Sequence, residues 1–362
     1  MSGDLERRYR RALRLLPRYY RDQWEEDMVA AFLDSSLTGD PEEDEFALEY
    51  GRPSWPEVAS VAALALRLNL GGAGAPRRYF AWGQAVRRAV LVVMLGQAVF
   101  GLVAIVSLAW THHLLGWLPA PPHPHLVRGQ SAAGDNVWPA VRATVGYAYI
   151  VVYVGLLLGY YRTAQLIALL AAVPFPVYLL HMQSAYHQPW LAGPWAGTFL
   201  FVLAPVLAMA AFRRDAPPVA RRPWLLALAA GFVLVAVPML AAQMTGYDGW
   251  VPGYYGLGCI LVAVLSLVQA RSRRASSRPA SSRLASDPGA WSLALVLLAA
   301  VAAVVQIAWL TTLLHEPGRL IQSLVELAVM AIAVALIVPD AGRTQTAMPA
   351  RPRAALDSGQ AR

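Results

Sequence analysis

Apolar residues gather in long runs along this chain, and the first run begins only after a charged segment of 88 residues. It extends from Ala89 to Trp110 and contains no charged side chain. At a rise of about 1.5 Å per residue, a helix of this length crosses a hydrocarbon layer about 30 Å thick. The run therefore predicts a membrane-spanning helix, preceded directly by Arg87 and Arg88.

Further apolar runs follow the first, and each predicts another span. Their predicted ranges are 141–161, 164–180, 195–212, 224–244, 254–269, 290–310 and 320–338. The expected fold class is all-α, with an integral membrane bundle of about eight transmembrane helices over residues 89–338. We expect residues 71–88 to form a juxtamembrane linker and residues 339–362 to form a disordered cytoplasmic tail.

The distribution of arginine predicts how the spans are oriented. All 30 basic residues are arginine, since the chain has no lysine. With eight spans, 27 of them fall on one side of the membrane, and only Arg128, Arg142 and Arg319 fall on the other. Arginine-rich short loops stay in the cytoplasm. We therefore expect a multi-pass protein of the cell membrane with both termini in the cytoplasm.

The first 70 residues have the period of amphipathic helices instead. We expect two helices within residues 4–36, separated at Pro17, with a basic first helix and a more acidic second one. In the second helix four large apolar residues recur at every fourth position, and we expect them to hold the pair together: Tyr20, Trp24, Met28 and Phe32.

A third helix is expected to begin at Ser54 and to end near Leu70. Ser54 and Glu57 have the spacing of a capping box, and Pro56 is tolerated in a first helical turn. Residues 1–70 are thus predicted to be a small cytoplasmic helical domain.

The net charge of +8 does not predict nucleic-acid binding. Residues 1–70 hold 9 arginines and 14 acidic residues, whereas residues 71–362 hold 21 arginines and 8 acidic residues. The basic excess therefore lies beside the predicted spans, where membrane topology accounts for it. We expect the lipid bilayer as a partner and no direct contact with nucleic acid.

The seven histidines all fall in predicted outer loops or at outer ends of spans. His112, His113, His123 and His125 are close in sequence, and imidazole is a common metal ligand. Their spacing matches no established zinc motif. Two interpretations stay open, an extracytoplasmic metal or proton site and a set of ordinary loop residues. No cofactor is expected, and a single cysteine, Cys259, allows no cysteine-based zinc site.

Glu326 is the only acidic residue well inside a predicted span. Such a residue can line a pathway, stay protonated, or pair with Arg142 or Arg319, and the sequence does not choose between a structural and a functional role.

Other polar and helix-bending residues within the spans are expected to shape their packing. We predict hydrogen bonds between helices from Gln97, Gln165, Gln243 and Gln306. Kinks are expected at Pro174, Pro205 and Pro238. Gly155 and Gly159 have the spacing of a close helix–helix contact.

The chain carries no motif of a known enzyme class. It has no HExxH, no P-loop, no dinucleotide-binding glycine pattern and no GxSxG. We therefore expect no catalytic residues.

Residues 5–34 resemble the helix-turn-helix-associated α-helical signalling (HAAS) domains at the N-terminus of many actinobacterial membrane proteins. The shared features are a basic first helix, Leu16-Pro17 at the break, Tyr20-Arg21 after it, Glu26-Asp27-Met28, and then Phe32. Residues 52–57, RPSWPE, are also similar to the segment that follows in those proteins. The resemblance implies a membrane-anchored signalling partner of PadR-like transcription regulators, with no catalytic residues.

The expected function is therefore that of a sensor or signalling component coupled to a soluble cytoplasmic regulator. The partner would contact either the arginine face of the first helix, including Arg7 and Arg11, or the acidic group Glu25, Glu26 and Asp27. Two alternatives remain, a transporter or permease subunit and a membrane scaffold without activity. Whether the protein forms a homo-oligomer is left open.

Overall fold

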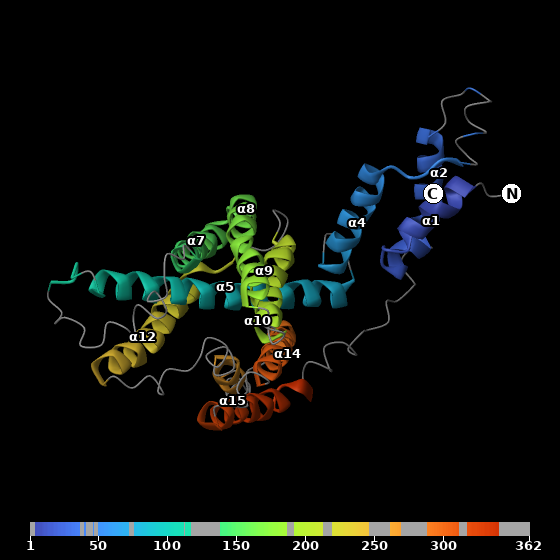
Figure 1. The fold of residues 1–362 in the computed structure, drawn as a ribbon. Helices are drawn as coiled ribbons and strands as arrows, with labels where there is room; N and C mark the ends of the chain where they lie inside the picture. The colour runs from blue at the N-terminus through green and yellow to red at the C-terminus, as the bar shows by residue number, and fades with distance from the viewer. Residues whose placement is uncertain are drawn as a thin grey trace. The chain divides into compact units, whose positions relative to one another are not determined.

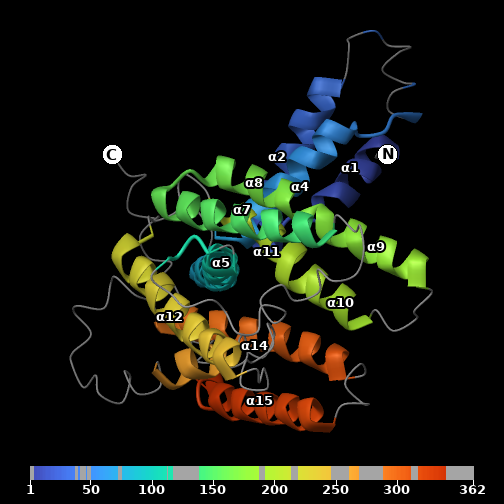
Figure 2. The same ribbon diagram turned by 60° about the vertical axis from the view of Figure 1, so that its left-hand side comes forward.

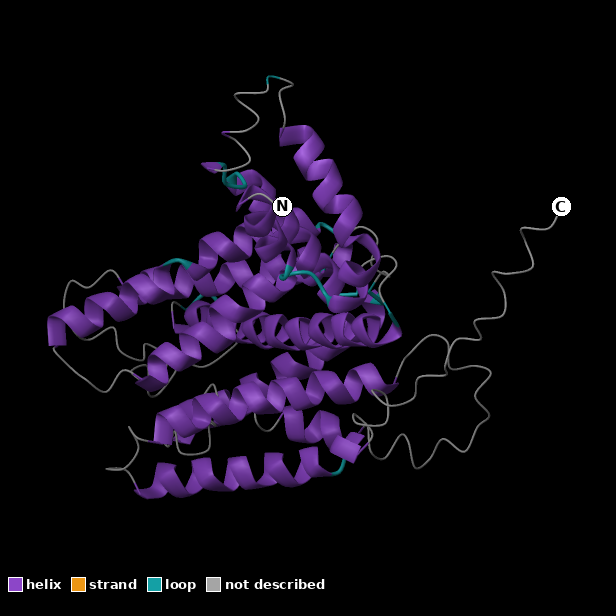
Figure 3. Cartoon of the chain, turned by 90° about the vertical axis from the view of Figure 1, so that its right-hand side faces the viewer, coloured by secondary structure: helices purple, strands orange, loops and turns teal. Residues whose placement is uncertain are grey.

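The computed structural model describes residues 4–36, 40, 46, 50–71, 76–111, 113–116, 138–186, 192–212, 219–245, 261–268, 288–310 and 317–339. Every regular element in these ranges is a helix, and none is a strand (Figure 3). This confirms the predicted all-α class. The chain divides into two compact units, residues 1–178 with 201–248 and residues 179–200 with 249–362.

Three helices form the start of the first unit. α1 (Asp4–Leu13) and α2 (Arg18–Ser36) are separated at Pro17, as the sequence predicts. α4 (Trp55–Asn69) begins after Ser54, whose backbone N–H donates to the Glu57 carboxylate at 2.5 Å. The predicted capping box is therefore present, and it fixes the start of α4.

α5 (Arg77–Thr111) is the longest helix, with 35 residues. It begins directly after Pro76, whose carbonyl accepts the backbone N–H groups of Tyr79 at 2.9 Å and Phe80 at 3.2 Å. The helix therefore includes residues 77–88, most of the segment 71–88 that was predicted to be a linker. At about 1.5 Å per residue it is roughly 50 Å long, which is longer than a hydrocarbon layer is thick. Figure 2 looks along α5 and shows α7 (Trp138–Leu158), α11 (Ala204–Ala208) and α12 (Arg221–Thr245) around it.

α7 and α8 (Tyr161–Ala172) form a tight helical hairpin. Gly159 ends α7 with φ +92°, a left-handed conformation that favours glycine. A Cβ built on Gly155 would lie 3.3 Å from the Cβ of Ala164 on α8, so the two helices approach closely there. The predicted close contact is confirmed at Gly155, whereas Gly159 forms the turn.

The three prolines inside predicted spans have different effects. Pro174 begins α9 (Pro174–Tyr186), which follows α8 after the single residue Val173, and Val173 keeps helical backbone angles of φ −57° and ψ −44°. The predicted third span is therefore interrupted at Pro174 but remains one apolar helical segment. Pro205 lies in a fourth apolar segment of mixed geometry, which consists of α10 (Ala192–Gly197), the π-helical η1 (Thr198–Leu203), α11 and the 3₁₀ turn η2 (Met209–Ala211). Pro238 is inside α12, which remains α-helical.

The second unit contains α14 (Pro288–Leu310) and α15 (Pro317–Ala335), which pack against each other. α14 also packs against α10. Residues 261–268 are helical as well.

Four of the described helical segments are long and apolar enough to cross a membrane: Tyr79–Trp110, Tyr161–His181, Arg221–Ala241 and Ala290–Ala308. Three shorter apolar segments, Thr144–Leu158, Trp195–Ala211 and Leu320–Ala335, coincide with further predicted spans. Only residues 261–268 of the predicted sixth span are described. The predicted tail lies outside the described residues, apart from residue 339.

Candidate functional site

The N-terminal helices α1, α2 and α4 share one apolar core, and Figure 1 shows them together next to the start of α5. Tyr9 of α1 and Phe32 of α2 stack with ring centroids 4.0 Å apart and an interplanar angle of 9°. The buried core side chains are Leu5, Tyr9, Leu13, Leu16, Val29, Phe32, Val61, Ala65 and Leu68. Each helix contributes to this core, so the three helices stabilise one another.

The four-residue stripe predicted for α2 lies only partly in this core. Phe32 is buried, and Tyr20 and Met28 pack against the core with partial exposure. Trp24 is 43% exposed and contacts the ring of Tyr20 at the surface. The helix turns every 3.6 residues, so positions four apart drift around it by about 40° per step. Val29, three residues before Phe32, takes the core position instead.

The basic α1 and the more acidic α2 are joined by charge pairs that converge on Arg10. Its guanidinium donates to both carboxylate oxygens of Glu26 at 2.7 and 2.8 Å and to Glu6 at 2.9 Å, and it lies 3.5 Å from Glu25. The hydrogen bonds from Arg10 hold the pKa of Glu26 below its ordinary value. The same contacts raise the pKa of Arg10. The bidentate geometry aligns the Arg10 and Glu26 side chains, but because Glu26 is exposed the pair adds only modestly to the packing of the two helices.

These contacts divide the predicted partner residues into two groups. Glu25 and Glu26 are engaged with Arg10, and Arg7 pairs with Asp4 on its own helix. Arg11 and Asp27 are exposed, and neither forms an ion pair with another described residue. The fully solvated charges of the predicted face are therefore Arg11 and Asp27.

Backbone contacts join the N-terminal helices to α5. Gly71 ends α4 with φ +75°, and a Cβ built on it would lie 2.7 Å from the Cα of Phe80. A Cβ on Gly83 would lie 2.1 Å from the carbonyl oxygen of Leu70. Any larger residue at Gly83 would meet backbone atoms, so the end of α4 and the first turns of α5 touch without intervening side chains.

Aromatic packing supports the same junction. The ring of Tyr19, at the start of α2, lies 5.1 Å from the ring of Tyr79 in the first turn of α5. The junction therefore fixes α2 as well as α4 relative to the first apolar helix. In the sequence, the glycines near residue 71 are the only local signal of this junction.

Two of the predicted glutamines satisfy backbone carbonyls of the irregular fourth apolar segment. Gln165 on α8 donates its Nε2 hydrogen to the Met209 carbonyl at 2.7 Å, and Gln97 on α5 donates to the Phe201 carbonyl at 3.4 Å. Both are predicted hydrogen bonds between helices, and the Met209 carbonyl also accepts the backbone N–H of Phe212 at 2.9 Å. The side chain of Gln243 lies outside the described residues.

Arg87 lies in the same region and is almost fully buried. Its guanidinium carbon is 5.2 Å from the centroid of the Phe212 ring, in cation–π geometry. This contact links α5 to the end of the fourth apolar segment. From its sequence position Arg87 is only a charge that flanks an apolar run, because nothing local indicates its aromatic partner.

Glu326 is half-buried on α15 and is held by two glutamines. Gln306 of α14 donates to one carboxylate oxygen at 3.2 Å, and Gln322 of α15 donates to the other at 3.0 Å. The predicted contact of Gln306 between helices is thereby confirmed. The side chains of Arg142 and Arg319, which the sequence offered as partners, lie outside the described residues.

Of the four candidate metal-binding histidines, three lie outside the described residues: His112, His123 and His125. His113 is described and exposed, with φ +57°. Among the residues that the structure describes, no group of three or more His, Cys, Asp or Glu side chains is arranged to hold a metal ion.

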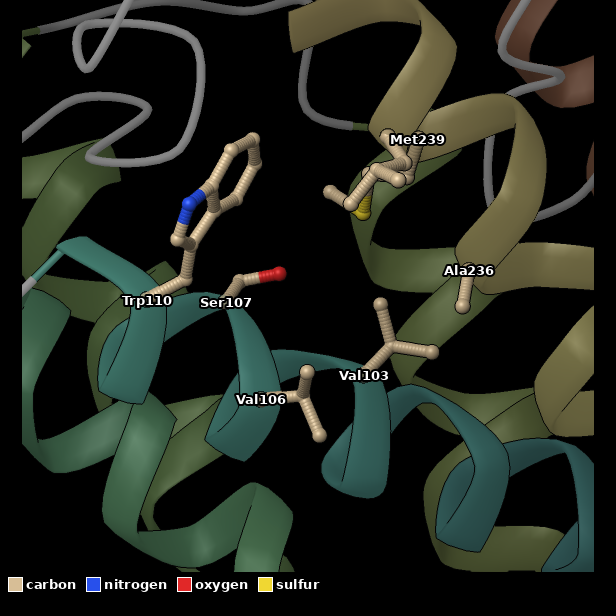
Figure 4. A pocket seen from close by; sticks show the side chains of 7 residues that line it. Val103, Val106, Ser107, Trp110, Ala236 and Met239 are labelled. Carbon is tan, nitrogen blue, oxygen red and sulfur yellow. The ribbon is translucent and has the colours of Figure 1, made fainter. Parts of the chain in front are cut away.

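A small apolar pocket of about 30 Å³ lies between α5 and α12 (Figure 4). It is lined by Val103, Val106, Ser107, Trp110, Ala236, Met239 and Leu240. It has room for a group the size of one or two water molecules, and none of its lining residues is titratable. The pocket therefore offers no catalytic arrangement.

The described residues thus include the Arg10 network, the α4–α5 junction, the glutamine and Arg87 contacts to the fourth apolar segment, and the Glu326 group. Comparison of the chain with protein-family models, curated proteins and solved structures found no match.

Proposed function

We propose that this protein is a multi-pass plasma-membrane protein with eight spans and cytoplasmic termini, and that it serves as a signalling or sensor component. Its N-terminal helices would pass a signal from the membrane bundle to a soluble transcription regulator of PadR-like type. This proposal rests on the resemblance of residues 5–34 to HAAS domains and on the junction between these helices and α5.

Exposed apolar side chains on the long helices support the membrane assignment. On α12, Leu226, Val237 and Leu234 are 70%, 60% and 59% exposed. Continuous apolar surface of this kind is unusual on a protein surrounded by water and is expected on a helix that faces lipid. The three shorter apolar segments and residues 261–268 supply the remaining spans of the proposed eight.

The observation that carries the signalling proposal is the backbone contact of α4 with α5. The linker between these helices is short, and Leu70 and Gly71 lie directly against Phe80 and Gly83. A displacement of α5 in the membrane would therefore move α4 as well. Because α4 shares its core with α1 and α2, the displacement would reach the whole N-terminal group.

Charge indicates where a regulator would bind this group. Arg11, near the end of α1, and Arg14, in the turn that follows it, are both exposed and have no acidic partner among the described residues. Leu15, four residues after Arg11, is 52% exposed. Two arginines beside an apolar side chain suit an acidic amphipathic surface on the partner, which both charge and burial would hold.

The test is capture of a PadR-like regulator from the native cell by the tagged, detergent-solubilised full-length protein, with identification by mass spectrometry. We expect capture by the wild type and at least a tenfold loss when Arg11 and Arg14 are both replaced by Glu. Arg18→Glu, an exposed arginine of α2 that lies 3.8 Å from Asp22, is the matched control and should retain capture. Absence of any such regulator, or equal capture by all variants, would count against the proposal.

A transporter or permease subunit is the second candidate, and the irregular fourth apolar segment favours it. π-helical turns and proline breaks occur at functional sites of membrane helices, and this segment contains both. Substrate flux into vesicles that is lost in Glu326→Gln would support transport. If these vesicles show no flux of any tested substrate, the result would favour a signalling protein or a scaffold.

A further inference from the structure

The hydrogen bonds around Glu326 come from groups that can serve either state of a carboxyl group. Oε1 accepts from Gln322, one turn earlier on α15, and Oε2 accepts from Gln306 on the neighbouring α14. Gln306 is only 5% exposed. In this arrangement both oxygens of a carboxylate are hydrogen-bonded, one within the helix and one across the helix pair.

A glutamine amide has an N–H₂ donor on one side and a carbonyl acceptor on the other. Rotation of the amide by half a turn exchanges the two. A protonated Glu326 can then donate its O–H to one glutamine oxygen and still accept an N–H from the other glutamine. The same three residues therefore satisfy the carboxylate and the carboxylic acid, which an arginine or lysine partner could not do because it only donates.

The surroundings favour a change of protonation over a permanent charge. α14, α10 and residues 261–268 contain no charged or titratable residue. On α15 the only other charged residue is Arg319, two turns before Glu326, and its side chain lies outside the described residues. The charged form of a carboxyl group among apolar helices is high in free energy unless it is paired. We therefore expect the protonated form of Glu326 to be populated.

We propose that Glu326, Gln306 and Gln322 form a proton-binding site inside the bundle. The two amides reorient when Glu326 gains or loses its proton, and the direction of the bond between Gln306 and Glu326 reverses. Because this bond links α14 with α15, the protonation state is coupled to the contact between the two helices. The inference does not depend on the proposed signalling role.

The test uses the purified full-length protein in detergent and an apolar fluorescent carbodiimide. The O–H of a protonated carboxyl group adds across one C=N bond of the reagent, and the O-acylisourea that forms rearranges to a stable N-acylurea. Labelled peptides are mapped by mass spectrometry between pH 5 and 9. We expect label on Glu326 that decreases with rising pH along a single-proton curve and is absent in Glu326→Gln.

The glutamines provide the specific readout. Gln306→Leu and Gln322→Leu each remove a donor to the carboxylate, so each should move the labelling midpoint to higher pH by about one unit. Gln97→Leu removes a glutamine in the other unit of the chain and should leave the midpoint unchanged. If Gln306→Leu does not fold, Gln322→Leu and the wild-type titration still decide the matter.

Three results would overturn the proposal. Label that is absent at every pH, or that emerges only in Arg319→Leu, would mean that an ion pair holds the carboxylate permanently charged. Protection by Na⁺ at constant pH would assign the site to a metal cation. A midpoint that is unchanged in both glutamine variants would show that the amides do not stabilise the carboxylate.

Discussion

Replacement of Gly83 by alanine tests whether α4 and α5 are joined backbone to backbone. The new Cβ would lie 2.1 Å from the carbonyl oxygen and 2.6 Å from the carbonyl carbon of Leu70, whereas ordinary contacts begin at 3.4 Å. The end of α4 must therefore move away from α5 by about 1 Å or more. Overpacking of this kind costs about 1–3 kcal/mol, which corresponds to a factor of about 5–150 in the opening equilibrium of the junction.

Hydrogen exchange followed by mass spectrometry measures this opening directly. In the Gly83→Ala variant we expect exchange in the last turn of α4 and the first turns of α5 to be about 5–150 times faster than in the wild type. Gly96→Ala is the matched control on the same helix, because nothing lies within 4 Å of a Cβ built there, and it should leave exchange unchanged or slow it. Equal exchange in the Gly83 and Gly96 variants would refute the backbone junction.

Three further predictions concern packing, pH and the fourth apolar segment. Phe32→Ala should destabilise the N-terminal helices by about 3 kcal/mol, whereas Trp24→Ala should cost less than about 1 kcal/mol, as measured by hydrogen exchange. Because hydrogen bonds from α1 lower the pKa of Glu26, its contribution is fully present above about pH 4.3 and is lost as the pH falls through the folded pKa. Glu26→Gln should therefore increase exchange at pH 7 and match the wild type in melts well below pH 4. Gln165→Leu should destabilise the protein by about 1 kcal/mol and lower Tm more than Gln97→Leu, whose bond is longer, 3.4 Å against 2.7 Å.

The helices of the N-terminal group could be predicted from sequence because their signals are local. Pro17 separates α1 from α2, and Ser54 with Glu57 begins α4, as expected. The core positions of α2 were harder to predict. A spacing of four residues resembles the helical period, but its drift carries Trp24 to the surface and leaves Val29 in the core.

The features that could not be predicted from the sequence are contacts between distant segments. Gly83 looks like an ordinary residue near the start of a helix, and only the approach of Leu70 gives it a role. Glutamines in apolar helices predict hydrogen bonds, but not that Gln165 would pair with the carbonyl of Met209. For Glu326 the sequence left open a pathway role, a protonated state or a pair with Arg142 or Arg319, whose side chains lie outside the described residues. The described partners are two glutamines, and nothing local in the sequence indicated that Gln306 would reach Glu326 across the helix pair.

The central claim is that the N-terminal helices and the tail lie on the cytoplasmic side of an eight-span bundle. The most direct measurement fuses a reporter enzyme that is active only outside the cytoplasm to the N-terminus, to the connection between α5 and α7, and to the C-terminus. The account predicts activity for the fusion between α5 and α7 and none for either terminus. Activity at a terminus, or none between α5 and α7, would contradict the proposed topology and the signalling role that depends on it.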